Sequence, residues 1–208
     1  MTLKEEYINL LKSTAREGMD GVIQYLDKAG FFMAPASAKQ HLNYEGGLLE
    51  HSMNVCKMAL MLREQILAMR PELEKQLGKD SVVIAALLHD VCKTTRYRKV
   101  QKYRKDEYGR WETYDAYESD SSRFPVGHGE KSVIMLLQLG LKLCKDEIVA
   151  IRWHMGAWDL SFQSYEQKAN ISEANGRFPL ASLLQAADSL STYLLESDSD
   201  GNAANEKK

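Results

Sequence analysis

Hydrophobic residues recur along most of the chain at the three- and four-residue spacing typical of helices that bury one face. Near the start, Leu3, Tyr7 and Leu11 follow this spacing, and Gly18 interrupts it. A second helix, capped by Asp20, is expected to follow. The same pattern predicts later helices over residues 47–69, 81–92, 129–140, 145–155 and 179–196. The chain is therefore expected to fold as an all-α helical bundle.

One of these helices differs from the others in its polarity. Residues 81–92 contain the run Val-Val-Ile-Ala-Ala-Leu-Leu, which is apolar nearly all round a helix. A helix without a polar face has to be covered by protein on every side. We therefore expect this helix at the centre of the bundle.

Residues 96–118 have a different period. Their side chains alternate in character from one residue to the next in two runs, and Tyr108, Gly109 and Arg110 lie between the runs. This pattern predicts a small β-hairpin inserted into the bundle at about 96–118. By contrast, residues 157–178 show no regular pattern and are expected to form a loop with little regular structure.

The composition is that of an ordinary globular protein of 208 residues, with 27% charged residues and a net charge of −2. So small a net charge gives no overall attraction to nucleic acid or to an anionic membrane. No apolar run approaches the roughly 18 residues that cross a bilayer, and the acidic start does not fit a signal peptide. Cys56, Cys92 and Cys144 are odd in number and widely spaced, which favours free thiols in a reducing compartment. We expect a cytoplasmic protein without a membrane partner.

A chain of this length is most simply one domain. We expect a single helical domain over residues 1–197, followed by a disordered tail over 198–208 whose residues have nothing to bury.

Four of the five histidines and two aspartates form an ordered series along the predicted helices. Imidazoles and carboxylates are side chains that hold divalent first-row metals. Two members, His89 and Asp90, end the most apolar helix, where a charged carboxylate needs a compensating cation. Each member alone would more often be a hydrogen-bonded or ion-paired residue than a ligand. In chain order the series is His51, His89, Asp90, His128, His154 and Asp188.

The sequence around this series is distinctive in two places. These are Gly46-Gly47-Leu48-Leu49-Glu50-His51-Ser52 and Ala86-Leu87-Leu88-His89-Asp90-Val91-Cys92-Lys93. With Asp188, they make the chain similar to the HD-domain superfamily of metal-dependent phosphohydrolases over about residues 41–192. The two stretches most resemble the HD domain of certain bacterial 3′-to-5′ exoribonucleases. The separate OB-type nucleic-acid-binding domain of those enzymes is not expected here.

The resemblance implies a binuclear metal site like that of the HD-superfamily members that bind two metal ions. One divalent ion would be held by His51, His89, Asp90 and Asp188, and a second by Asp90 with His128 and His154. Asp90 would bridge both ions and Lys93 would stabilise charge on the phosphate, so these two are the expected catalytic residues. The metal itself is left open among iron, manganese, magnesium, cobalt, nickel and zinc. A third ion is not expected, because His154 has no histidine neighbour.

Basic and aromatic residues are interleaved in the predicted hairpin, and seven basic residues lie from Lys93, just before the hairpin, to Lys105. Such a segment can bring cations and rings to a nucleotide, with Lys93, Arg96 and Arg98 as substrate-binding residues. A solvated hairpin whose aromatic residues pack on the bundle is an equal alternative. Acidic residues in the same segment dilute its charge, which favours a small phosphorylated substrate over long nucleic acid.

The expected function is therefore that of a metal-dependent phosphohydrolase, a phosphomonoesterase or phosphodiesterase. It would act on a nucleotide or short oligonucleotide by metal-activated hydroxide. Two alternatives stay open. The same ligand order, with a lysine after the His-Asp pair, resembles HD-fold di-iron oxygenases, and an HD module that binds a nucleotide without turnover would have the same ligands.

Overall fold

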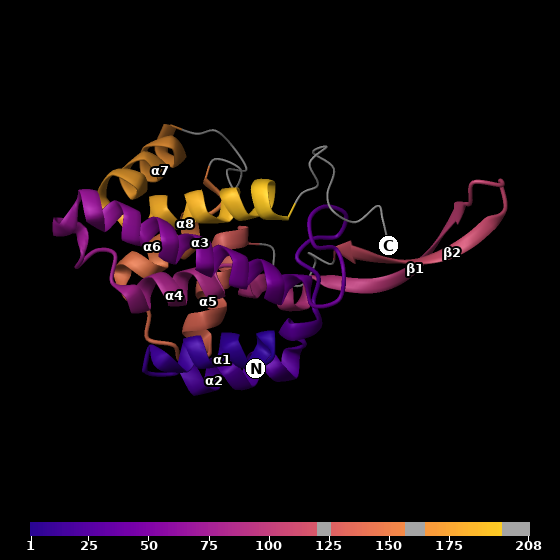
Figure 1. Cartoon of the computed structure of the whole chain (residues 1–208), viewed down its shortest axis with the longest axis horizontal. Helices are drawn as coiled ribbons and strands as arrows, with labels where there is room; N and C mark the ends of the chain where they lie inside the picture. The colour runs from indigo at the N-terminus through magenta and orange to yellow at the C-terminus, as the bar shows by residue number, and fades with distance from the viewer. Residues whose placement is uncertain (120–125, 157–164, 197–208) are drawn as a thin grey trace.

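The computed structural model describes residues 1–119, 126–156 and 165–196 of the chain. In these ranges α-helices form a body from which one two-stranded hairpin projects (Figure 1). The helices are α1 (Leu3–Ser13), α2 (Met19–Ala29), α3 (Gly47–Met69), α4 (Lys79–Leu88), α5 (His128–Gln138), α6 (Lys145–Trp153), α7 (Tyr165–Arg177) and α8 (Pro179–Leu190). The strands are β1 (Tyr97–Lys105) and β2 (Trp111–Ser119). The predicted all-α fold with an inserted hairpin is confirmed.

Helix α4 is the centre of the hydrophobic core, as its apolar run predicts. Every residue from Val82 to Leu88 is buried. Helices α1, α3, α6 and α8 pack against it. Burying a large aliphatic side chain stabilises the fold by about 1.5–3 kcal/mol. This helix therefore fixes the position of whatever follows its last turn.

The structure corrects three of the predicted boundaries. Residues 165–177 form α7 where a loop was expected; most of the side chains of residues 168–177 are exposed, so no strong apolar period marks the helix. Helix α4 ends at Leu88 and gives way to a 3₁₀-helix at Val91–Thr95. Helix α2 begins directly after Gly18, so that Asp20 lies inside it and does not cap it. The expected tail, residues 198–208, lies outside the described residues.

The hairpin is an antiparallel pair with a continuous register from Tyr97 opposite Ser119 to Lys105 opposite Trp111. Its turn is held by Asp106, whose carboxylate accepts hydrogen bonds from the backbone amides of Tyr108 and Arg110 at 2.9 and 2.8 Å. The hairpin and its turn thus lie where the alternating pattern predicts them.

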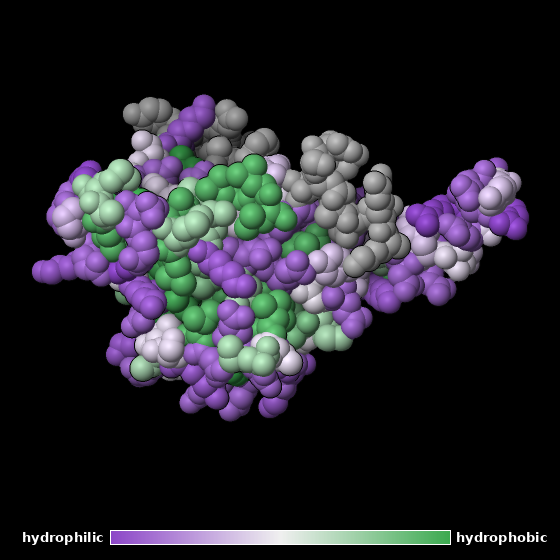
Figure 2. Space-filling model, in the orientation of Figure 1, coloured by the Kyte–Doolittle hydropathy of each residue, from purple (hydrophilic) through white to green (hydrophobic). Residues whose placement is uncertain are grey.

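The surfaces of the helical body and of the hairpin differ in hydropathy. Figure 2 shows apolar and polar residues mixed over the helical body, whereas the projecting hairpin is mainly hydrophilic. Within the described ranges, none of the helices combines the length and apolar character that a membrane crossing would require.

Candidate metal centre

His51 is positioned by the way α3 begins. Gly46 has a φ of 87°, a left-handed conformation that favours glycine. A Cβ atom on Gly47 would lie 2.0 Å from the carbonyl oxygen of Leu42, so this close approach also requires glycine. The helix begins at Gly47 and carries His51 one turn later, with 1% of its surface exposed.

His89 and Asp90 are held where α4 ends. The last carbonyl groups of a helix lack partners within the helix, and one of them, that of Leu87, accepts a hydrogen bond of 2.7 Å from the hydroxyl of Tyr7 in α1. The amide of Lys93 donates to the carbonyl of Asp90 at 2.9 Å as the chain turns away. Both site residues are buried, with 0% and 2% of their surfaces exposed.

His128 and His154 are brought together by the close packing of α5 on α6. A Cβ atom on Gly129 would lie 2.2 Å from the carbonyl oxygen of Arg152 in α6, so only glycine allows the two backbones to approach this closely. His128 is the first residue of α5, and His154 directly follows the end of α6. Their ring centroids are 5.3 Å apart.

Asp188 completes the group from α8, which packs against both α3 and α6. Its Oδ1 atom lies 3.3 Å from Nε2 of His51, and 14% of its side chain is exposed. The structure therefore brings all six members of the sequence series together, from helices that are far apart along the chain. We call this group the metal centre: His51, His89, Asp90, His128, His154 and Asp188.

In three histidines of the metal centre, Nδ1 makes a hydrogen bond to an acceptor outside the centre. These contacts are His89 Nδ1 to the Ala86 carbonyl at 2.8 Å, His154 Nδ1 to the Ile151 carbonyl at 2.7 Å, and His51 Nδ1 to the Glu196 carboxylate at 3.0 Å. A neutral imidazole that donates from Nδ1 keeps its lone pair on Nε2. The three Nε2 atoms therefore present lone pairs to the interior of the centre, as metal-ligating histidines do.

The two carboxylate oxygens of Asp90 face different histidines. Oδ2 lies 3.4 Å from Nε2 of both His51 and His89. Oδ1 contacts Nε2 of His128 and lies 3.6 Å from Nε2 of His154. A carboxylate with its oxygens divided in this way has the arrangement needed to bridge two ions.

The donor atoms fit divalent transition metals. Nε2 of His154 is buried and has no hydrogen-bond partner among the described residues, and Nε2 of His51 lies 3.3 Å from that of His89. Buried polar atoms are costly without a partner, and a cation satisfies several lone pairs at once. Imidazole-rich sites suit iron, cobalt, nickel and zinc better than magnesium. Within the metal centre, three groups of donors lie close enough to hold an ion: His51 with His89 and Asp90, His89 with His154 and Asp188, and Asp90 with His128 and His154.

Charges within the centre keep its carboxylates ionised. Burial alone would raise the pKa of Asp90, but Lys93, His89 and His128 outweigh burial and hold it well below its usual range. Burial also opposes ionisation of Asp188, whose pKa is lowered by its hydrogen bond to His51 and by the nearby histidines. Both carboxylates are therefore available as anionic ligands, which metal binding requires.

Lys93 is also held in its charged form at this site. Its Nζ atom lies 2.7 Å from Oδ2 of Asp90, and 11% of its side chain is exposed. Burial lowers the pKa of Lys93, but the Asp90 carboxylate more than compensates and raises it above its usual value. The centre thus has one fixed ammonium group beside the carboxylate that faces both groups of histidines.

The predicted substrate-binding arginines lie in different surroundings. The guanidinium of Arg96 reaches Nδ1 of His128 at 3.1 Å and so lies at the edge of the metal centre. Arg98 extends from the hairpin with 70% of its side chain exposed, and its recorded ion pair is with Glu118 at 3.3 Å. No contact among the described residues joins Arg98 to the centre. The structure therefore places Lys93 and Arg96 at the site and leaves Arg98 outside it.

Two residues beside the centre, one partly buried and one buried, were not predicted from the sequence. His41 comes from the irregular connection before α3, and Glu196 follows the π-helix Ser191–Leu195 that continues α8. Glu196 lies eight residues after Asp188, a spacing that returns to the same side of a helix. That spacing is the signal that could have identified it. For His41 the sequence contains no comparable signal.

Comparison with known proteins agrees with this arrangement. The profile of the HD domain matches residues 48–193, more than half of the chain. The dihydroneopterin 2′,3′-cyclic phosphate phosphodiesterase of Methanocaldococcus jannaschii is 34% identical over 87 residues. That alignment covers 42% of this chain and 31% of the phosphodiesterase, so the chain matches about a third of its relative's length. No solved structure gives a significant match. The profile match, which includes five helices that carry the metal centre, shows that the chain belongs to the HD domain family.

Proposed function

We propose that this protein is a metal-dependent phosphohydrolase that cleaves a phosphoester bond in a nucleotide or short oligonucleotide. The observation that carries the proposal is the position of Asp90, whose two oxygens face separate groups of histidines while Lys93 contacts one of them. The HD domain match and the phosphodiesterase among the relatives support the same reaction class.

The ligands divide naturally into two groups that share Asp90. His51, His89 and Asp188 lie on the side of Oδ2 and would hold one ion, while His128 and His154 lie on the side of Oδ1 and would hold the other. When bound, such ions polarise a phosphoryl oxygen and lower the pKa of a coordinated water towards neutrality. The second group of donors supports the two-ion form over a mononuclear site.

Lys93 would bind the phosphate of the substrate. Its ammonium is held in place by Asp90 and remains protonated, so it can donate hydrogen bonds to phosphate oxygens without first gaining a proton. A preorganised donor in a site of low dielectric constant stabilises the charge that develops on these oxygens in the transition state. Arg96, beside His128, would add a second positive charge at the same side of the centre.

The substrate is best described as a small phosphodiester or phosphomonoester with a heterocyclic base. The relative named above is a phosphodiesterase of a cyclic phosphate of dihydroneopterin, which is a small heterocyclic compound. The net charge of −2 gives this chain no general attraction to long nucleic acid. Both observations favour a nucleotide-sized substrate, whose base would lie towards the hairpin.

Metal analysis followed by a substrate screen tests the proposal. Protein purified without added metal is analysed for bound metals, stripped with a chelator and reloaded with manganese, cobalt, iron or zinc. Phosphate release and phosphodiester cleavage are then measured over nucleotides, 2′,3′-cyclic nucleotides and dinucleotides. We expect about two metal equivalents per chain, and turnover that disappears with the chelator and returns with metal.

Two results would contradict the proposal. Turnover that persists in the fully stripped protein would show that the metal centre does not perform the reaction. A mixed-valent di-iron EPR signal, with oxygen consumption and without phosphate release under any metal, would favour the oxygenase that shares this ligand order.

A further inference from the structure

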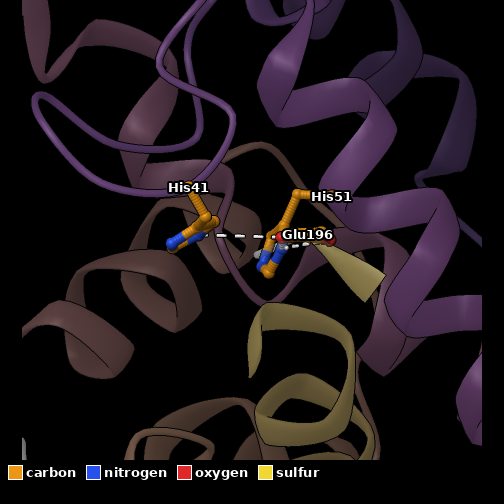
Figure 3. Close-up of side chains that lie close together, drawn as sticks. All are labelled: His41, His51 and Glu196. Carbon is orange, nitrogen blue, oxygen red and sulfur yellow. Dashed lines mark hydrogen bonds and ion pairs between the residues drawn. The ribbon is translucent and has the colours of Figure 1, made fainter. Parts of the chain in front are cut away.

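A second cluster of polar side chains, two of them buried and one partly buried, lies directly against the metal centre. It consists of His41, His51 and Glu196 (Figure 3). Only 2% of the surface of Glu196 is exposed, and both of its carboxylate oxygens face Nδ1 of His51, at 3.0 and 3.1 Å. His41 is more distant, with its Nε2 atom 4.0 Å from Oε2 of Glu196. The strongest contact of the cluster is therefore between Glu196 and His51.

The partner of His51 differs in kind from those of the other two histidines whose Nδ1 atoms point outwards. Nδ1 of His89 and of His154 donates to the backbone carbonyl three residues earlier in the same helix. Nδ1 of His51 instead meets a charged carboxylate that lies 145 residues away along the chain. A carboxylate at this position fixes the tautomer and ring orientation of a ligating histidine and makes it a more basic ligand.

Glu196 is itself held in place from α3. The side-chain amide of Asn54 donates a hydrogen bond of 3.1 Å to Oε1 of Glu196. Asn54 follows His51 by three residues and so lies on the same side of the helix. The carboxylate is thus held on the outer side of the His51 ring by contacts with His51 and Asn54.

The cluster could either hold an ion of its own or support the metal centre through His51. The number of lone pairs on the His51 ring distinguishes these two roles. If His41, His51 and Glu196 held an ion of their own, Nδ1 of His51 would have to be a ligand. Nε2 of the same ring already faces Asp90 and Asp188, at 3.4 and 3.3 Å. A neutral imidazole has one lone pair available in the ring plane. His51 therefore serves the metal centre through Nε2 and donates its Nδ1 proton to Glu196.

We propose that Glu196 is a positioning residue of the metal centre, which holds the Nδ1 proton of His51 and so presents Nε2 of His51 as a metal ligand. This inference rests on the proposed function in one respect only, that the centre binds metal. Glu196 contacts neither the substrate nor the ions. Through His51, Glu196 would change how tightly the centre binds the ion held by His51, His89, Asp90 and Asp188, and would change the ligand field of that ion.

The test compares Glu196→Ala and Glu196→Gln with Glu107→Gln, which removes the same charge from the exposed turn of the hairpin. Each stripped protein is titrated with manganese alone by calorimetry. Loss of a hydrogen-bonded carboxylate behind a ligating histidine typically weakens metal binding about 10- to 100-fold. We expect this loss for one of two ions in Glu196→Ala, a smaller loss in Glu196→Gln, whose amide oxygen still accepts the Nδ1 proton, and none in Glu107→Gln.

Cobalt provides a readout that a purely structural role would not change. The visible absorption bands of the cobalt-loaded protein report the ligand field, so Glu196→Gln should shift them while the melting temperature of the stripped protein stays close to that of the wild type. Unchanged manganese affinity and unchanged cobalt bands in both Glu196 variants would overturn the inference. So would a third equivalent of metal in the wild type that is lost in both Glu196→Gln and His41→Ala while the first two remain.

These outcomes also separate the inference from the proposed function. If the wild type binds two ions and hydrolyses a phosphoester while the Glu196 variants bind metal normally, only the role of Glu196 fails. If the wild type binds metal with the expected dependence on Glu196 but hydrolyses no phosphoester, the positioning role stands and the proposed reaction fails.

Discussion

The metal centre and the hairpin both contain carboxylates paired with nitrogen-containing side chains, but they place these pairs in opposite surroundings. In the hairpin the pairs lie across adjacent strands and are exposed, as in Lys99 with Asp115 at 2.7 Å and Arg104 with Glu112 at 2.6 Å. Such surface pairs contribute about 0–1 kcal/mol. In the centre, Asp90 is 2% exposed and its partners come from four other segments. Removing one partner from a buried charge costs about 3–5 kcal/mol.

The change from the buried surroundings of the metal centre to the exposed surroundings of the hairpin takes place within a few residues at the start of β1. Arg96 contacts His128, and Tyr97 is partly buried at the base of β1. Farther out, 69–74% of the surface of Tyr103, Tyr108 and Trp111 is exposed. The alternative in which the hairpin's aromatic residues pack on the bundle is therefore wrong for these three. Only the base of the hairpin is placed to influence chemistry at the centre.

The largest contrast is expected for the same substitution made in both regions. Asp90→Asn should abolish metal binding and lower turnover about 10³-fold or more, because a metal ion supplies several kcal/mol of transition-state stabilisation and about 1.4 kcal/mol is tenfold in rate. Asp115→Asn, in the hairpin, should keep both. Metal content and phosphodiester cleavage are measured for each. Comparable losses in the two variants would break the distinction between the regions.

We expect an effect of intermediate size on kcat when one lysine of each region, Lys93 or Lys99, is replaced by methionine. Lys93→Met should lower kcat about 10²- to 10³-fold, the usual cost of removing one preorganised donor from a developing oxyanion. Lys99→Met, which removes an exposed ammonium from β1, should leave kcat unchanged. The metal content of Lys93→Met is measured alongside. Full metal loading with low kcat separates loss of the phosphate contact from loss of the ions; normal kcat would remove Lys93 from the mechanism.

The smallest expected effect is a change in KM, and it should locate the boundary between the metal centre and the exposed hairpin more closely. Arg96→Ala is expected to raise KM about tenfold or more, because a hydrogen bond to a charged group contributes about 1.5–3 kcal/mol. Arg98→Ala, two residues farther along, should change KM less than about twofold, since its guanidinium is exposed and paired with Glu118. KM is compared on one nucleotide substrate at fixed metal concentration. Equal changes in the two variants would extend the site along the hairpin, and no change in either would exclude the hairpin base from substrate binding.

Much of the fold could be predicted from the sequence because the decisive patterns are local. The apolar run in α4 identifies the central helix, and strict alternation identifies the hairpin. The order of histidines and aspartates, through the family resemblance, predicts six residues as metal ligands, and the structure brings these six residues together. Helix α7 was missed because most of its described side chains are exposed, so that no broad apolar face marks it in the sequence.

The residues around the centre could not be predicted in the same way. A glutamate near the end of a helix is usually solvent-exposed, and only the packing of α8 on α3 brings Glu196 against His51. Likewise, Arg96 and Arg98 share a basic, aromatic-rich segment and look equivalent in the sequence. The twist of the chain from the 3₁₀-helix into β1 directs one towards His128 and the other towards solvent.

The hydrogen bond from Tyr7 to the carbonyl of Leu87 bears on how this protein can be truncated. Residues 48–193 match the HD domain profile, and Tyr7 lies outside that range. Its ring packs against Phe31 and Phe32, at centroid distances of 5.3 and 5.7 Å, and its hydroxyl closes the last turn before His89. A fragment cut at the family boundary would leave that carbonyl without its donor and uncover the face of α4 that α1 protects. We therefore expect a fragment of residues 48–193 to be less stable than a chain that keeps α1.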